Sequence, residues 1–282
     1  MLPLHKIIWH EWRAKNEPAR VPEPSEAMED MEQIRSYVKA YEWGGPTSAL
    51  QLHHLRELSK MIRAGDTVLD LACGPGPLLL ELAPLYPDCK FIGVDLSRPM
   101  LAVLREQADA RGLGNVEILF EDIRTLPSLQ GRQVDLVITT SALHHLPDLD
   151  SLQQTFQRME SLLGKNGGFY IFDFGLLRSH YTRELMVNEV AKLAPPITAK
   201  DYELSLKAAF PTKEVLRLAR EHLNRPYAAQ LSSFIEFFYF LQTPPKVSTP
   251  APVEKHLASV WAGLSTAMKM EYLMLRKMRR YS

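Results

Sequence analysis

Short apolar runs rich in β-branched residues alternate with amphipathic segments between residue 66 and about residue 242. Such a run predicts a buried strand, and the alternation is typical of a parallel sheet covered by crossover helices. Five runs are predicted strands of that sheet: 67–71, 90–94, 116–120, 134–139 and 169–174. Two later runs, 227–232 and 234–241, are joined tightly enough to pair antiparallel. The pattern therefore predicts an α/β fold with seven strands.

Helices are predicted where apolar residues recur at spacings of three and four. Between the strands these segments are 77–85, 98–111 and 149–163, and before the first strand they are 28–39 and 47–62. The segment 175–210 separates the fifth and sixth strands and is long for a simple connection. We expect it to be a helical insertion that covers the substrate side of a site.

Four prolines between residues 244 and 252 mark a linker, after which 253–280 is predicted to be one amphipathic helix with a basic end. We expect this helix to pack on the domain or on a second copy, as a homodimer contact, ahead of contact with an anionic partner and, last, of a position on a membrane surface. The predicted parts of the chain are an N-terminal helical cap (1–62), a central α/β domain (63–243) and the linker with its C-terminal helix (244–282).

The charge balance and the cysteine content narrow the class of protein. The chain has 33 basic and 33 acidic residues, so its formal net charge is zero, which disfavours a nucleic-acid partner. It has two cysteines, Cys73 and Cys89, and a disulfide at Cys73 would constrain a tight turn. No segment approaches the run of about 20 apolar residues that spans a bilayer. These features predict a cytoplasmic protein without a membrane partner.

The strongest chemical signal is the turn Ala72-Cys73-Gly74-Pro75-Gly76, which joins the first strand to a helix. Glycine lets the backbone approach a ligand closely, and the N-terminus of the helix favours an anionic group such as a carboxylate. Any tight turn between a strand and a helix favours glycine, so this turn alone leaves several nucleotide-like cofactors open.

Acidic residues follow the next two strands, at the edge where open α/β sheets bind ligands. Asp95 ends the second strand, where its carboxylate could accept hydrogen bonds from both hydroxyls of a ribose. After the third strand, Asp122 could accept from an adenine amino group while Ile123 packs on the ring. The fourth strand leads into Ser141-Ala142-Leu143-His144-His145-Leu146-Pro147-Asp148. The order of these residues along the chain indicates an adenosine cofactor.

With these motifs, residues 60 to 175 resemble the class I S-adenosylmethionine-dependent methyltransferases, in particular the small-molecule group with an Ala-Leu-His-His-Leu-Pro-Asp motif. The resemblance implies a Rossmann-like sheet of order 3-2-1-4-5-7-6 with an antiparallel last strand, and S-adenosyl-L-methionine as the cofactor. It implies cofactor contacts from the glycine turn, from the ends of strands one to four and from an N-terminal helix: Tyr41, Asp70, Ala72, Gly74, Gly76, Asp95, Leu96, Met100, Asp122, Ile123 and Thr140. Ala72 departs from the family, which usually has glycine there.

Three other functions stay open at this point. A dinucleotide-binding oxidoreductase needs a third glycine three residues after Gly76, where this chain has Leu79, and this disfavours NAD(P). The basic C-terminal segment leaves RNA methylation as a minor hypothesis. A methyltransferase-like protein that binds without catalysis is the third.

Methyl transfer from a sulfonium is an in-line displacement, so the protein mainly has to align the nucleophile and exclude water. If the acceptor is a nitrogen, oxygen or sulfur atom that carries a proton, a histidine is suited to take that proton. We therefore name His145 and, at the end of the fifth strand, Asp173 as candidate catalytic residues of a small-molecule methyltransferase. We expect no metal site, because His53-His54 has no second cluster of ligand spacing.

Overall fold

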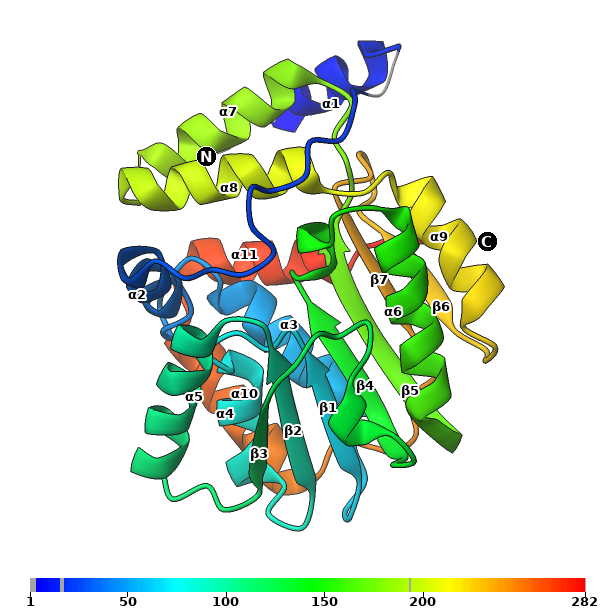
Figure 1. The fold of residues 1–282 in the computed structure, drawn as a ribbon. Helices are drawn as coiled ribbons and strands as arrows, with labels where there is room; N and C mark the ends of the chain where they lie inside the picture. Colours follow the sequence, from blue (N-terminus) through cyan, green and yellow to red (C-terminus); the bar gives the residue numbers. More distant parts are fainter. Residues whose placement is uncertain (1–3, 16–17, 193, 282) are drawn as a thin grey trace.

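The computed structural model describes residues 4–15, 18–192 and 194–281. One mixed sheet runs through this part of the chain in the order β3-β2-β1-β4-β5-β7-β6-β8 (Figure 1). Strands β1 to β5 are parallel neighbours, whereas β7 is antiparallel to β5, and β6 to β7. The strands are β1 (Thr67–Leu71), β2 (Lys90–Asp95), β3 (Val116–Phe120), β4 (Val134–Thr140), β5 (Leu163–Phe174), β6 (Ala228–Leu231), β7 (Phe238–Gln242) and β8 (Arg279–Tyr281).

The predicted order of the first seven strands and the antiparallel direction of the last are confirmed. Strands β1 and β3 have the predicted bounds, and the apolar side chains of β1 and β2 are buried because helices cover both faces. β5 begins at Leu163, earlier than predicted, because its first residues pair with β4 across an irregular register. β7 begins at Phe238, later than predicted.

Two hydrophobic clusters hold the helices against the two faces of the sheet. One cluster joins the sheet to α3 (Ser48–Leu58), α4 (Pro77–Leu82) and α5 (Arg98–Ala110). The other joins it to α6 (Leu149–Leu162) and α9 (Thr212–His222). Three short 3-10 turns, 83–85, 127–129 and 143–145, complete the connections. The result is a three-layer arrangement with the sheet in the middle.

The single C-terminal helix predicted for 253–280 is wrong. The chain forms α10 (Ala251–Gly263), then α11 (Thr266–Leu275), then strand β8, which extends the sheet by pairing with β6. Helix α10 ends at Gly263, and the Ser265 hydroxyl accepts a hydrogen bond from the backbone of Met268 to begin α11. The break lets Trp261 and Tyr272 pack with ring centroids 5.3 Å apart, which one straight helix would prevent.

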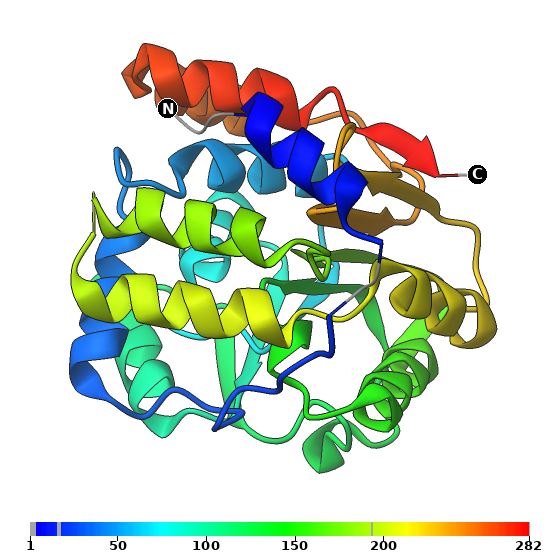
Figure 2. The same ribbon diagram turned by 90° about the horizontal axis from the view of Figure 1, so that it is seen from above.

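Four helices lie beyond the carboxyl ends of the parallel strands (Figures 1 and 2). They are α1 (Leu4–Arg13), α2 (Met31–Ala40), α7 (His180–Ala191) and α8 (Pro196–Ala208). Helices α7 and α8 confirm the predicted helical insertion, whereas α1 was not predicted. No helix in the described ranges is long and apolar enough to cross a membrane. The division of the chain into three parts stays a prediction, although α3, α10 and α11 share one cluster with the sheet.

Candidate cofactor and catalytic site

The turn after β1 places three residues in the left-handed region of backbone conformation: Ala72 (φ 53°), Gly74 (φ 55°) and Gly76 (φ 71°). Glycine adopts this conformation without a steric penalty, and Ala72 is a non-glycine residue that adopts it here. This explains why glycine is usual at the first of these positions. At Gly76 the requirement is stricter, because an added Cβ would lie 2.3 Å from a methyl carbon of Leu104.

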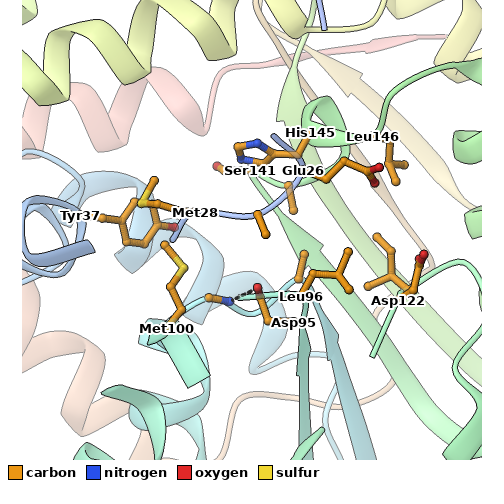
Figure 3. A pocket seen from close by; sticks show the side chains of 15 residues that line it. Glu26, Met28, Tyr37, Asp95, Leu96, Met100, Asp122, Ser141, His145 and Leu146 are labelled. Carbon is orange, nitrogen blue, oxygen red and sulfur yellow. Dashed lines mark hydrogen bonds between the residues drawn. The ribbon is translucent and has the colours of Figure 1, made fainter. Parts of the chain in front are cut away.

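Asp95 connects this turn to the end of β2. Its Oδ2 accepts a hydrogen bond from the backbone N–H of Gly74 at 2.7 Å (Figure 3). Its Oδ1 accepts a hydrogen bond from the backbone N–H of Ser97 at 2.8 Å. Burial raises the pKa of this carboxyl, and these backbone donors oppose the rise. Each carboxylate oxygen has a further lone pair that a ligand hydroxyl can use. The carboxylate therefore fixes the shape of the turn and can also bind a ligand.

The ends of β1 to β4 and the segment before α2 enclose one pocket, shown in Figure 3. Of the eleven predicted cofactor residues, seven line it: Ala72, Gly74, Asp95, Leu96, Met100, Asp122 and Ile123. The candidate base His145 lines it too. The structure thus brings residues from four separate strand ends to one cavity, as the order of the motifs predicted.

The other four predicted cofactor residues lie beside the pocket but do not line it. Asp70 is buried, and desolvation raises the pKa of its carboxyl well above the usual range. Thr140 is the last residue of β4, and Ser141, with φ 52°, lines the pocket in its place. Tyr41 stacks on Tyr37 at 4.7 Å between ring centroids, and Tyr37 is the one that lines the cavity. Gly76, the fourth of these residues, is the N-cap of α4.

Asp122, which the sequence resemblance assigns to the adenine, forms an ion pair with Arg124. The guanidinium of Arg124 donates to both carboxylate oxygens of Asp122, with its Nε 2.9 Å from each. Partial burial acts to raise the pKa of Asp122, but the hydrogen bonds from Arg124 outweigh it and lower the pKa. Arg124 also contacts Glu26 at 3.1 Å. Asp122 therefore stays ionised in the pocket wall.

Sequence patterns did not predict the course of the segment 18–30, which we call the strap. The helix predicted for 28–39 begins only at Met31, because the Asp30 side chain caps it there. The strap runs from below α1 past α8 to α2, across the carboxyl end of the sheet (Figures 1 and 2). Three of its residues, Glu26, Ala27 and Met28, line the pocket. Its backbone is tied to α8 by a hydrogen bond of 2.9 Å from the N–H of Val21 to the carbonyl of Lys207. Its prolines and scattered acids form no periodic pattern, so the sequence carried no signal for this role.

Arg20 holds the strap against the loop that contains the two histidines. Its guanidinium donates to four carbonyl oxygens, those of His144 (2.9 Å), Leu146, Pro147 (2.6 Å) and Ala208 (2.6 Å). It also lies over the ring of Phe210, 3.9 Å from the centroid. The planar fork of arginine suits several acceptors at once, so one side chain fixes the strap, the histidine loop and the end of α8.

Each of the two histidines is paired with a carboxylate. His144 Nδ1 lies 2.7 Å from Asp173 Oδ1, and the backbone N–H of His144 donates to Asp173 Oδ2 at 3.0 Å. His145 Nδ1 lies 3.3 Å from Glu23 Oε2 in the strap. Burial opposes the charged form of His145, but the hydrogen bond and the charge of Glu23 outweigh burial and raise its pKa.

Among the described residues, Glu23, His144 and His145 also form a group of three side chains of the types that can bind metal ions. Their candidate ligand atoms all lie within 4.8 Å of one another, although no metal site was expected from the sequence. Glu23 Oε1 is 3.8 Å from His144 Nε2, too far for a hydrogen bond. Glu23 is therefore in close contact with His145, at 3.3 Å, and not with His144.

Comparison with known proteins agrees with this geometry. A family model described as a methyltransferase domain matches residues 62–222. The chain is 28% identical over 163 residues to the demethylmenaquinone methyltransferase of Thermus thermophilus, covering 55% of this chain and 72% of that enzyme. It is 27% identical over 114 residues to the (S)-tetrahydroprotoberberine N-methyltransferase of Eschscholzia californica, covering 39% of this chain but only 32% of that protein's length.

Solved structures share the fold. The plantazolicin methyltransferase BpumL in complex with SAH matches with a TM-score of 0.57 at 13% identity, covering 87% of this chain and 96% of that one. The PH0226 protein of Pyrococcus horikoshii matches with a TM-score of 0.55 at 23% identity, covering 77% of this chain and all of that one. The family match confirms the predicted methyltransferase family. The chain belongs to the methyltransferase-domain family.

Proposed function

We propose that this protein transfers the methyl group of S-adenosylmethionine to a nitrogen, oxygen or sulfur atom of a small molecule by in-line displacement. The observation that carries the proposal is the pocket at the carboxyl edge of the sheet, where cofactor-type residues and His145 meet. Relatives named as an N-methyltransferase and as a malonyl-[acyl-carrier protein] O-methyltransferase support both nitrogen and oxygen as acceptors. The family match does not support the nicotinamide-dependent alternative.

The residues in the pocket wall fit the parts of the cofactor. We assign the methionine part to the turn around Gly74, whose backbone faces the pocket. Asp95 would accept hydrogen bonds from the ribose hydroxyls through its free lone pairs. Leu96 and Ile123 would pack on the adenine, and Asp122 would accept from its amino group. When bound, the cofactor supplies the methyl group on a positively charged sulfur.

The protein's own contribution is alignment, exclusion of water and removal of a proton. The strap and the insertion lie over the carboxyl edge and shield it (Figure 2). The side chain of His145 is 31% exposed, and this residue lines the pocket, so an acceptor can reach it. We propose that His145 takes the proton that the acceptor loses. Asp173 has no exposed surface, so its role is to position the loop through His144.

Calorimetric titration of the full chain with S-adenosylmethionine tests the assignment of the pocket. We expect saturable binding that weakens at least about tenfold in Asp95→Ala, because hydrogen bonds to a charged group contribute about 1.5 to 3 kcal/mol each. Asp109→Ala is the matched control, since Asp109 is exposed on α5 and does not line the pocket. Equal affinity in the Asp95 variant and the control would refute the assignment.

The acceptor is tested separately. Incubation with methyl-labelled cofactor and a pool of small metabolites should yield labelled product, whereas transfer only to RNA would favour the RNA alternative.

The location of the protein in the cytoplasm and a homodimer through the C-terminal helices remain proposals. Exposed apolar side chains on α11, Met270, Leu273 and Met274, support the homodimer. Sedimentation velocity of the wild type and of Met270→Lys would test it.

A further inference from the structure

The two carboxylate and imidazole pairs differ in what surrounds them. Asp173 accepts three hydrogen bonds: from the ring of His144, from the backbone of His144, and from the backbone of Phe174 at 2.7 Å. The side chains of both members are at most 2% exposed. This pair is enclosed and its bonds anchor the loop. The pair formed by His145 and Glu23 lies at the pocket, and its carboxylate comes from the strap.

We propose that Glu23 is the positioning residue of the methyl-transfer reaction: it fixes the tautomer and the orientation of His145 so that Nε2 can take the acceptor's proton. This inference rests on the proposed function. It names a residue outside every motif that the sequence carried, and it separates the tasks of the two carboxylates. Asp173 holds the loop, and Glu23 prepares the base.

The tautomer follows from the contact. An ionised carboxylate can only accept hydrogen bonds, so Glu23 Oε2, 3.3 Å from Nδ1 of His145, favours the tautomer that has its proton on Nδ1. In neutral His145 the proton then sits on Nδ1, and Nε2 carries the lone pair. Without this carboxylate the neutral ring could also have its proton on Nε2, and it could turn away from the acceptor. The contact therefore supplies the protonation state that a base needs.

Glu23 is itself held on both sides. Its Oε1 accepts a hydrogen bond of 2.9 Å from the Ser205 hydroxyl of α8, and its Oε2 faces His145. Arg20 and Val21 tie the adjoining strap to the histidine loop and to α8. Because the side chain is only 13% exposed, little water competes for these bonds. The Glu23 carboxylate is thus held in place by the strap and α8 rather than by the sheet.

Several other charged groups face this pair. Asp95 at the end of β2, Asp173 at the end of β5 and Asp201 of α8 interact electrostatically with His145 or Glu23. Arg20 is the positive group among them. The acid in direct contact with the ring is Glu23, so its removal should have the largest effect on His145.

The proposed step balances. A lone pair on the acceptor atom forms the new bond to the methyl carbon while the bond from carbon to sulfur breaks, and its electrons neutralise the sulfonium. The acceptor's proton passes to Nε2 of His145. The resulting imidazolium is then adjacent to the Glu23 carboxylate, which stabilises its charge. No oxidant, reductant or further reactant is required.

NMR of the full chain with labelled histidine tests the inference without any acceptor. Nitrogen shifts report the tautomer, a pH titration reports the pKa, and His145→Gln assigns the signal. In Glu23→Gln we expect mixed tautomers and a lower pKa for His145, because the carboxylate that stabilises the imidazolium is gone. Glu23→Asp should restore part of the wild-type behaviour. Glu26→Gln is the matched control, since it weakens the strap's contact with Arg124 and leaves Glu23 in place.

The outcomes separate this inference from the proposed function. An unchanged tautomer and pKa in Glu23→Gln, with cofactor binding intact, would overturn the role of Glu23 alone. Failure of the wild type to bind S-adenosylmethionine would overturn the proposed function instead. Equal changes in Glu26→Gln would mean that the whole strap, and not Glu23, sets the state of the ring.

Stoichiometric zinc binding that Glu23→Gln abolishes would reassign Glu23 and the histidines to a metal site and overturn the inference. If Glu23→Gln does not fold, the comparison of Glu23→Asp with the wild type decides.

Discussion

A buried histidine in α3 should make the stability of this protein depend on pH. The side chain of His53 is only 5% exposed and packs edge-on against Phe240, with ring centroids 5.0 Å apart. Burial lowers the pKa of His53 from 6.5 to about 4; the charge of Glu57 opposes this, and that of Lys60 adds to it. In the unfolded chain the imidazole regains its ordinary pKa.

The sign and the size follow from these two values. Between pH 6.5 and pH 4 the unfolded chain binds a proton at His53 that the folded protein does not, so the free energy of unfolding falls as the pH falls. The full loss is about 3 kcal/mol and is complete below the folded pKa, and about 2 kcal/mol of it is lost by pH 5. Above pH 6.5 the contribution is fully present.

Urea denaturation of wild type and His53→Leu at pH 7 and pH 5 measures this effect. The drop in unfolding free energy between the two pH values should be smaller in the variant by about 2 kcal/mol. Gln51→Leu is the control, because Gln51 is equally buried in the same helix but carries no titratable proton. The reasoning would be refuted if the unfolding free energy of His53→Leu fell between pH 7 and pH 5 by as much as that of the wild type. It would also be refuted if the unfolding free energy of Gln51→Leu fell by less than that of the wild type.

Two substitutions near the pocket complete the set. Gly76→Ala should lower the free energy of unfolding by about 2 kcal/mol or more, because the new methyl group would overlap Leu104 and φ is positive. Gly112→Ala, also at positive φ but with no atom within 4 Å of the added Cβ, should cost only about 1 kcal/mol, and equal losses in denaturation would contradict the steric argument. Arg20→Lys keeps the charge but cannot reach four carbonyl oxygens at once, so we expect a lower melting temperature and weaker binding of S-adenosylmethionine in calorimetry. Wild-type values for both quantities would show that the strap does not depend on this clamp.

The sheet, and the meeting of candidate cofactor residues in one pocket, could be predicted because local sequence determines both. Each buried parallel strand is a continuous apolar run, and the residue that follows it lies at the carboxyl edge. Asp95 and Asp122 could therefore be placed in one pocket from their order alone. The eighth strand was missed because Arg279–Tyr281 is short and follows a helix break, between Gly263 and Thr266, that was not predicted.

The strap could not be predicted, because its position depends on contacts between residues far apart in sequence. Arg20 meets carbonyl groups more than 120 positions away, and Glu23 meets a serine 182 positions away. Neither contact leaves a periodic pattern in the residues around it. Sequence patterns also could not distinguish between Tyr37 and Tyr41. Helical spacing placed both on one face, and only packing decided which one lines the pocket.

The site is formed partly by strand ends of the sheet and partly by segments that cover the sheet. This difference affects which parts of the site can change without disturbing the fold. The proposed cofactor side consists of strand ends whose positions are set by the sheet register, so a change there alters the fold as well as binding. The proposed acceptor side consists of the strap, the histidine loop and α8, which Arg20 and Glu23 hold together through side chains. Exchange of residues on α8 or the strap would therefore alter the space next to His145 while the turn at Gly74 stays in place. The same donor site can then serve different acceptors, which is consistent with the different acceptors in the names of the related enzymes.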